Sequence, residues 1–167
     1  MKRGEKGFTL IELLIGVAIT GVIIGALAMT TMTVLTNPER STDQNVVLQE
    51  VRNAGYWISR DVQMARNLTL GEPSGFTLSI HIPVDSDENN DYRVDYLFDG
   101  DKLKRQEYDS LDNLTSETLI AEYIDTSNTT FSTLASCLYK LTVRAAKGKA
   151  IVTASYEASQ RLPPPPQ

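Results

Sequence analysis

The stretch FTLIELLIGVAITGVIIGALAM, residues 8–29, decides how this chain can fold. The sequence stays weakly apolar to Leu35, and the 28-residue window from Phe8 to Leu35 contains a single charged residue, Glu12. At about 1.5 Å per residue, a helix of this length spans about 42 Å, more than the roughly 30 Å hydrocarbon core of a membrane. The sequence therefore predicts a membrane-spanning helix, because a soluble core of this size could hardly use so long an apolar run.

The charges that flank this run predict its orientation. Lys2, Arg3 and Lys6 precede it, whereas Glu39 and Arg40 cancel one another beyond it. The positive-inside rule then places the N-terminus in the cytoplasm and the rest of the chain outside. A secretory signal peptide also has a basic start and an apolar run. This run exceeds the apolar region of about 7–15 residues typical of such peptides, and no small-x-small site closes it cleanly.

The remainder of the chain has the composition of a polar, acidic domain. The 167 residues carry a net charge of −5, and the part beyond Arg40 holds 12 basic and 18 acidic side chains. Without a Lys/Arg cluster, direct nucleic-acid binding by this domain is not expected. The single cysteine, Cys137, and the single histidine, His81, provide neither an intramolecular disulfide nor a zinc ligand set. With no catalytic constellation or phosphate-binding loop, we expect no enzyme.

Glu12 is the residue that a plain membrane anchor does not explain. An unpaired carboxylate deep in a membrane is energetically costly, so Glu12 needs a partner or a shallow position. Two interpretations stay open. Glu12 lies near the interface, where the positive end of the helix dipole favours it, or it awaits a cation from another molecule.

Residues Lys6-Gly7-Phe8-Thr9-Leu10-Ile11-Glu12 follow a short basic leader and lead into the apolar run. They resemble the type IV prepilin cleavage and methylation motif of pilins and of secretion and competence pseudopilins. The resemblance implies that prepilin peptidase cuts after Gly7 on the cytoplasmic side and methylates the new amino group of Phe8. It further implies that Glu12 pairs with that amine, mostly on a neighbouring subunit, as a helical fibre assembles. Other pilins or pseudopilins and an inner-membrane assembly platform are the implied partners.

Three glycines in the apolar run suggest close packing between helices. Gly21 and Gly25 have the small-xxx-small spacing that lets membrane helices approach, and Gly16 adds another notch. The alternative is that these glycines have no specific role, since glycine is common in membrane helices.

The chain beyond the apolar run predicts a second helical segment and then strands. Thr36-Asn37-Pro38 should kink the helix or make it restart. Apolar residues then recur at steps of three and four, at Val47, Val51, Ala54, Ile58, Val62 and Ala65. The expected organisation is a leader at 1–7, a membrane and assembly helix at 8–36, an amphipathic helix at 37–70, a β-domain at 71–162 and a proline-rich tail at 163–167.

Within the β-domain, strands are expected at 76–82, 92–98, 102–108, 119–124, 138–144 and 151–156. An antiparallel sheet packed on the helix stripe gives an α+β fold, and this order of elements resembles the pilin fold. Residues 56–61 and 96–105 resemble minor pilins and pseudopilins of the W or J type. The chain lacks the paired C-terminal cysteines of many major pilins.

An acidic loop offers the one candidate for a cofactor site. Oxygen ligands stand at every second position, as in calcium loops, at Asp85, Asp87, Asn89 and Asp91. Asn90 stands where an EF-hand prefers glycine, and Tyr96 where it has its bidentate glutamate. A solvated hairpin loop is the alternative to a calcium site.

These observations favour a minor pilin or pseudopilin over an extracytoplasmic enzyme. The alternative that stays open is a single-pass, membrane-anchored extracytoplasmic binding module that never polymerises. Motility pili, type II secretion and DNA uptake share the motif, so the sequence does not choose among these machines.

Overall fold

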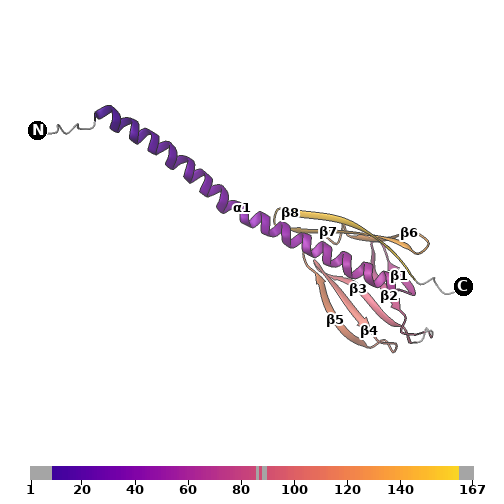
Figure 1. The fold of residues 1–167 in the computed structure, drawn as a ribbon. Coiled ribbons are helices and arrows are strands. Elements are labelled where there is room, and N and C mark those ends of the chain that lie inside the picture. Colours follow the sequence, from indigo (N-terminus) through magenta and orange to yellow (C-terminus); the bar gives the residue numbers. More distant parts are fainter. Residues whose placement is uncertain (1–8, 86, 88–89, 162–167) are drawn as a thin grey trace, which may run out of the picture. The chain divides into compact units, whose positions relative to one another are not determined.

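The computed structural model describes residues 9–85, 87 and 90–161, and for residues 33–41 the backbone only. The predicted leader, Gly7, Phe8, Asn89 and the proline-rich tail lie outside the described residues. Two compact units make up the chain, Met1–Ser41 and Thr42–Gln167. The described part contains one helix, α1 (Leu10–Met64), followed by eight strands (Figure 1).

The first unit contains the N-terminal part of α1. Its stretch Leu10–Met32 has 23 residues with a mean hydropathy of 2.5, which is long and apolar enough to cross a membrane. The side chains here are exposed, from Ile15 at 51% to Leu10 at 83% among the large apolar ones at this end. None of the described residues buries this segment, which fits the single-pass anchor predicted from the sequence.

Two expectations about the helix are corrected. The backbone is helical throughout Leu10–Met64, so a restart of the helix at Pro38 is wrong, while a kink there stays a prediction. A proline removes a single backbone donor, and the neighbouring turns keep theirs. The helix also ends at Met64 rather than at residue 70. From Arg66 onward the backbone pairs with a strand instead, and the Arg66 N–H donates to the carbonyl of His81 at 2.8 Å.

The strands form two antiparallel sheets where the sequence predicted one. The five-stranded sheet has the order β1 (Asn67–Gly71), β2 (Gly75–Ile82), β3 (Tyr92–Asp99), β4 (Lys102–Tyr108) and β5 (Leu114–Ala121). The three-stranded sheet consists of β6 (Thr130–Ala135), β7 (Leu138–Lys147) and β8 (Ala150–Ser159). The α+β fold with a long helix and antiparallel sheets is confirmed. Strands β1 and β6 were not predicted, and β5 begins at Leu114 rather than Leu119.

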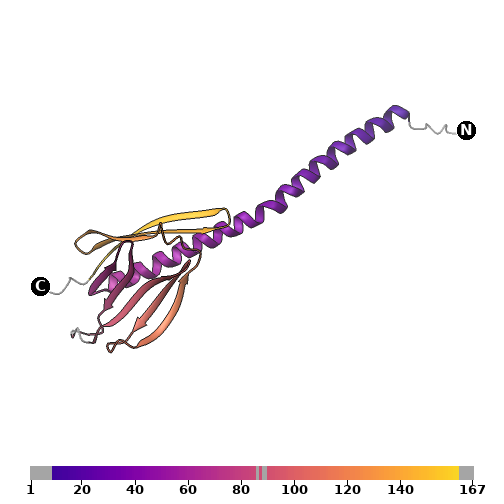
Figure 2. The ribbon, with the colours of Figure 1, turned by 180° about the vertical axis from the view of Figure 1, so that it is seen from behind.

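The core lies between the C-terminal part of α1 and both sheets, which flank that part of the helix in both views (Figures 1 and 2). The predicted helix stripe is confirmed, because all six of its residues have no exposed surface. Val94 and Tyr96 of β3 are also fully buried, which identifies the face of that strand that packs on the core. Fully buried core residues from the other strands include Leu78, Ile80, Leu103 and Val143.

Gly75 is the point where the two sheets meet. The Phe131 N–H of β6 donates to the Ser74 carbonyl at 2.8 Å, next to the start of β2. Gly75 has a φ of 86°, and a Cβ there would lie 1.9 Å from the Phe131 carbonyl oxygen. Glycine is required at this position both for its backbone conformation and for the approach of β6.

Candidate functional site

The first turn of α1 is organised by Thr9 and Glu12. The Glu12 carboxylate accepts hydrogen bonds from the Thr9 N–H at 3.0 Å and from the Thr9 hydroxyl at 2.9 Å. In return, the Glu12 N–H donates to the Thr9 hydroxyl oxygen at 3.4 Å. This reciprocal pattern is a capping box, with Thr9 at the N-cap and Glu12 three residues later. It explains why α1 begins at Leu10.

The capping box gives Glu12 a role within its own chain that the sequence interpretation missed. The signal was present, since a threonine followed three residues later by glutamate before an apolar run is typical of a helix start. Both bonds from Thr9 end on Oε2 of the carboxylate. The side chain is exposed, so its charge is directed at the surroundings of the helix.

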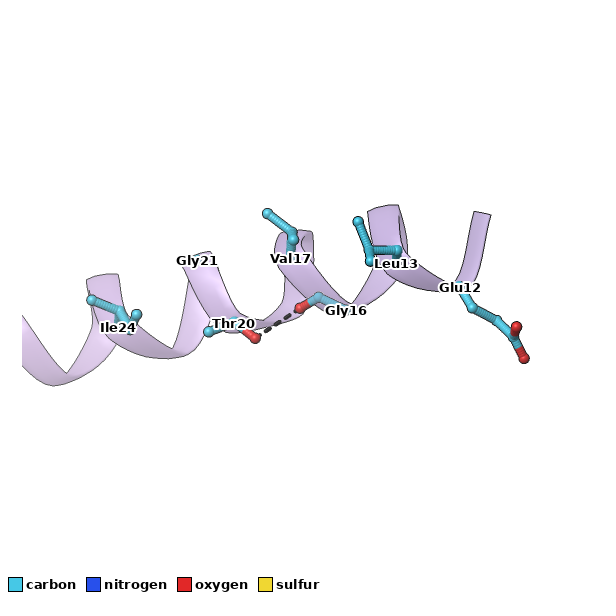
Figure 3. Close-up of a pocket in the computed structure, with 7 residues that line it drawn as sticks. All are labelled: Glu12, Leu13, Gly16, Val17, Thr20, Gly21 and Ile24. Carbon is cyan, nitrogen blue, oxygen red and sulfur yellow. Dashed lines mark hydrogen bonds between the residues drawn. The ribbon is translucent and has the colours of Figure 1, made fainter. Parts of the chain in front are cut away.

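Glu12 stands at one end of a surface of α1 that contains two glycines, which we call the glycine face (Figure 3). This face is lined by Glu12, Leu13, Gly16, Val17, Thr20, Gly21 and Ile24. The Thr20 hydroxyl donates to the Gly16 carbonyl at 2.7 Å, so this polar group is satisfied within the helix. A Cβ at Gly16 or Gly21 would meet nothing within 4 Å. Of the three predicted packing glycines, Gly16 lies one turn from Glu12 on the same side of α1, whereas Gly21 lies about half a turn round the helix from Glu12 and Gly25 does not line this face.

A buried polar cluster in the second unit was also missed. Oδ2 of Asp61, on α1, accepts hydrogen bonds from the Tyr96 hydroxyl and from Nε of Arg105, each at 2.7 Å. Arg105 also pairs with the Glu107 carboxylate. Burial raises the pKa of Tyr96, and the negative charge of Asp61 raises it further. The signal in the sequence was Asp61 itself, an acidic residue that lies seven positions after Ala54 and therefore on the apolar side of the helix.

The acidic loop is held together by its own contacts. Oδ1 of Asp85 accepts from the Asp87 N–H at 2.7 Å, and Oδ2 accepts from the Asn90 amide at 2.9 Å. These hydrogen bonds lower the pKa of Asp85. Arg66 lies 3.4 Å from the Asp91 carboxylate, where its guanidinium already supplies a positive charge.

Among the described residues, no group of three or more acidic, histidine or cysteine side chains is arranged to hold a metal ion. Asn89, the remaining proposed ligand, is not among them. Calcium binding by this loop therefore stays a prediction.

Comparison with known proteins identifies the N-terminal segment. Residues 2–28 match the family described as the prokaryotic N-terminal methylation motif. This family is structural rather than catalytic. No curated protein and no solved structure matches the chain.

Proposed function

From the type IV prepilin-like N-terminus of this chain, we propose that it is a minor pilin or pseudopilin subunit. Prepilin peptidase cuts it after Gly7 and methylates Phe8, and the mature chain assembles with other pilins into a type IV pilus or a secretion or competence pseudopilus. The observation that carries the proposal is the methylation motif at residues 2–28, which runs directly into a membrane-length helix with no buried side chain. Before assembly, the N-terminus is cytoplasmic and the second unit extracytoplasmic.

The chemistry of Glu12 supports assembly through a charge pair. An N-methylated amine at Phe8 remains cationic, and in an apolar bundle of helices each ion alone would bear its full desolvation cost. The capping box holds the Glu12 carboxylate at the N-terminal end of α1, the end at which the amine of Phe8 is generated. A neighbouring subunit that offers this amine would neutralise the charge.

The glycine face supports a packing role in the same assembly. Membrane helices associate through close contact of their backbones, and small residues at the interface permit this contact. Gly16 leaves open space one turn from Glu12, so a second helix could approach closely where the charge needs its partner. Gly25 extends the small-residue spacing by one turn.

Mass spectrometry of the mature N-terminus tests the processing step. We expect a chain that begins with N-methyl-phenylalanine at position 8 when it is expressed with prepilin peptidase. A Gly7→Val variant places a larger side chain directly before the cleavage site, and it should therefore retain its leader. A wild-type chain with an intact Met1, or one cut after the apolar run, would contradict the proposal.

A pair of variants separates the charge of Glu12 from its capping role. Glu12→Gln keeps a side chain that can complete a capping box but removes the charge, whereas Thr9→Ala removes the cap and keeps the charge. We expect both to insert into the membrane, and only Glu12→Gln to lose incorporation into fibres. Normal incorporation of Glu12→Gln would show that charge pairing is dispensable, and absence of the wild-type chain from fibres would favour a binding module that does not polymerise.

A further inference from the structure

The second unit has a groove on the surface of α1 that the proposed function does not use. We call it the arginine groove, and it has a volume of about 460 Å³. Its lining comes from α1 and from one residue of β8, and comprises Arg52, Gly55, Tyr56, Ser59, Arg60, Gln63 and Tyr156.

Gly55 and Tyr156 shape this groove. The Tyr156 ring packs against the helix at Gly55, where a Cβ would lie 2.3 Å from the ring. The Tyr156 hydroxyl donates to the Val51 carbonyl at 3.2 Å, which fixes the ring on the helix. Beside it, Tyr56 is 62% exposed and meets the Trp57 ring edge to face at 6.0 Å. The groove therefore has one aromatic wall fixed on the helix, Tyr156, and one exposed aromatic side chain, Tyr56.

Two arginines flank the groove without a carboxylate partner among the described residues. Arg66, Arg93, Arg105 and Arg144 each form an ion pair with an aspartate of the chain. Arg52 and Arg60 form none in the described part, although Arg60 lies 5.3 Å over the Trp57 ring. Both are exposed. They are eight residues apart on α1, about 12 Å along its axis.

We propose that the arginine groove binds an acidic segment of another protein, whose carboxylates pair with Arg52 and Arg60 while its side chains pack against Tyr56. Guanidinium groups match carboxylates in a bidentate geometry. Tyrosine and arginine are also the residues that dominate the energetics of protein interfaces. The binding of an acidic segment does not require fibre formation. If the partner is another subunit of the fibre, that identification rests on the proposed function.

The small number of basic side chains in the groove favours a short protein segment over other anions. A nucleic acid is bound through many phosphate contacts, and the groove offers two guanidinium groups. Anionic lipid surfaces are recognised by clusters of about four to eight basic residues, and the groove contributes two. Arg52 and Arg60 lie on either side of Tyr56 along α1. They suit a short segment whose carboxylates have the same separation, about 12 Å along the helix axis.

A labelled peptide tests the groove on the full chain in neutral detergent micelles. The probe is a fluorescein-labelled deca-glutamate peptide, followed by fluorescence anisotropy at low and high salt, with deca-glutamine as the uncharged control. We expect salt-sensitive binding that the double variant Arg52→Gln, Arg60→Gln weakens at least tenfold. Tyr56→Ala should weaken it several-fold, whereas Lys140→Gln with Lys149→Gln, which removes the same charge outside the groove, should change it less than twofold.

Three results would overturn the proposal. These are no binding of the peptide, equal binding by the double arginine variant, or an equal loss in the lysine control. Binding of anionic vesicles or of a DNA oligonucleotide that depends on Arg52 and Arg60, with none of deca-glutamate, would assign the groove to another class of ligand. Methylation of Phe8 is measured on the same samples. Peptide binding tests the groove and methylation tests the proposed function, and either property can be lost while the other persists.

Discussion

Asp61 is a charged residue in a position that the helix pattern reserves for apolar ones. It has no exposed surface, and its Oδ1 has no hydrogen-bond partner in the described part of the chain, while Oδ2 accepts both Tyr96 and Arg105. Ion pairs of this kind recover little net stability because desolvation offsets their attraction. Removing one partner of such a pair is nevertheless costly, because the other partner is left charged and buried. We interpret the cluster as a constraint on how α1 sits against β3 and β4.

Replacing Asp61 alone should therefore cost more than replacing the pair. We expect Asp61→Ala to lower the free energy of unfolding by about 3–5 kcal/mol, since it leaves the Tyr96 hydroxyl and Nε of Arg105 buried without their shared acceptor. The double variant Asp61→Leu, Arg105→Met should lose less. Denaturant unfolding of the full chain in micelles, followed by the fluorescence of Trp57, measures both. A double variant that is less stable than Asp61→Ala would contradict this interpretation.

Tyr96 should make the fold sensitive to alkaline pH. Burial and the charge of Asp61 raise the pKa of Tyr96 in the folded chain above the value of about 10 for an unfolded one. Stability from this group is complete below pH 10 and is lost as the pH rises further, because the unfolded chain releases a proton that the folded chain keeps. In a spectroscopic titration of the seven tyrosines, the last ionisation should coincide with unfolding. Tyr96→Phe should remove this last step, and its persistence in that variant would show that another tyrosine causes it.

The contact between α1 and β8 depends on a glycine inside a helix. Alanine normally stabilises a helix interior over glycine by about 1 kcal/mol. At position 55 the added Cβ would lie 2.3 Å from the Tyr156 ring, so the ring would have to move. The two elements are thus fitted to one another at this point, and helix propensity is overridden by packing.

The sign of the Gly55→Ala effect tests this fit. We expect a loss of about 1–3 kcal/mol in the free energy of unfolding, as for other overpacked sites. In a Tyr156→Ala background the same change should become neutral or stabilising, because the obstructing ring is gone. Unfolding of the four chains of this double-mutant cycle measures the coupling. A stabilising Gly55→Ala in the wild-type background would contradict the contact.

The second unit as a whole requires its two sheets to join beside Gly75. Gly75 and Gly100 both have positive φ, 86° and 63°, but only Gly75 has a neighbour within 4 Å. We expect Gly100→Ala to cost about 1–2 kcal/mol from the backbone conformation alone. Gly75→Ala should cost clearly more, since its Cβ would also collide with the Phe131 carbonyl. Equal losses in denaturant unfolding would show that the junction adjusts freely.

Much of this architecture could be predicted from local patterns. The apolar stripe from Val47 to Ala65 was found because helical spacing is a local property, and β4 was predicted with its observed ends by its position after the Asp99-Gly100 turn. Strand β1 was missed because residues up to 70 were assigned to the helix, although Leu68 and Leu70 alternate with polar residues and pack against the core as β1 pairs with β2. The capping role of Thr9 could have been found, since its signal is local.

By itself, the sequence determined the membrane-length helix, the methylation motif and the antiparallel α+β composition, because each depends on residues close together in the chain. The tertiary structure decided the division into two sheets, the pairing of Asp61 with Arg105 across 44 positions, and the walls of the arginine groove. These features join residues whose separation in the chain carries no periodic signal. They arise when burial of the helix stripe forces distant side chains into contact.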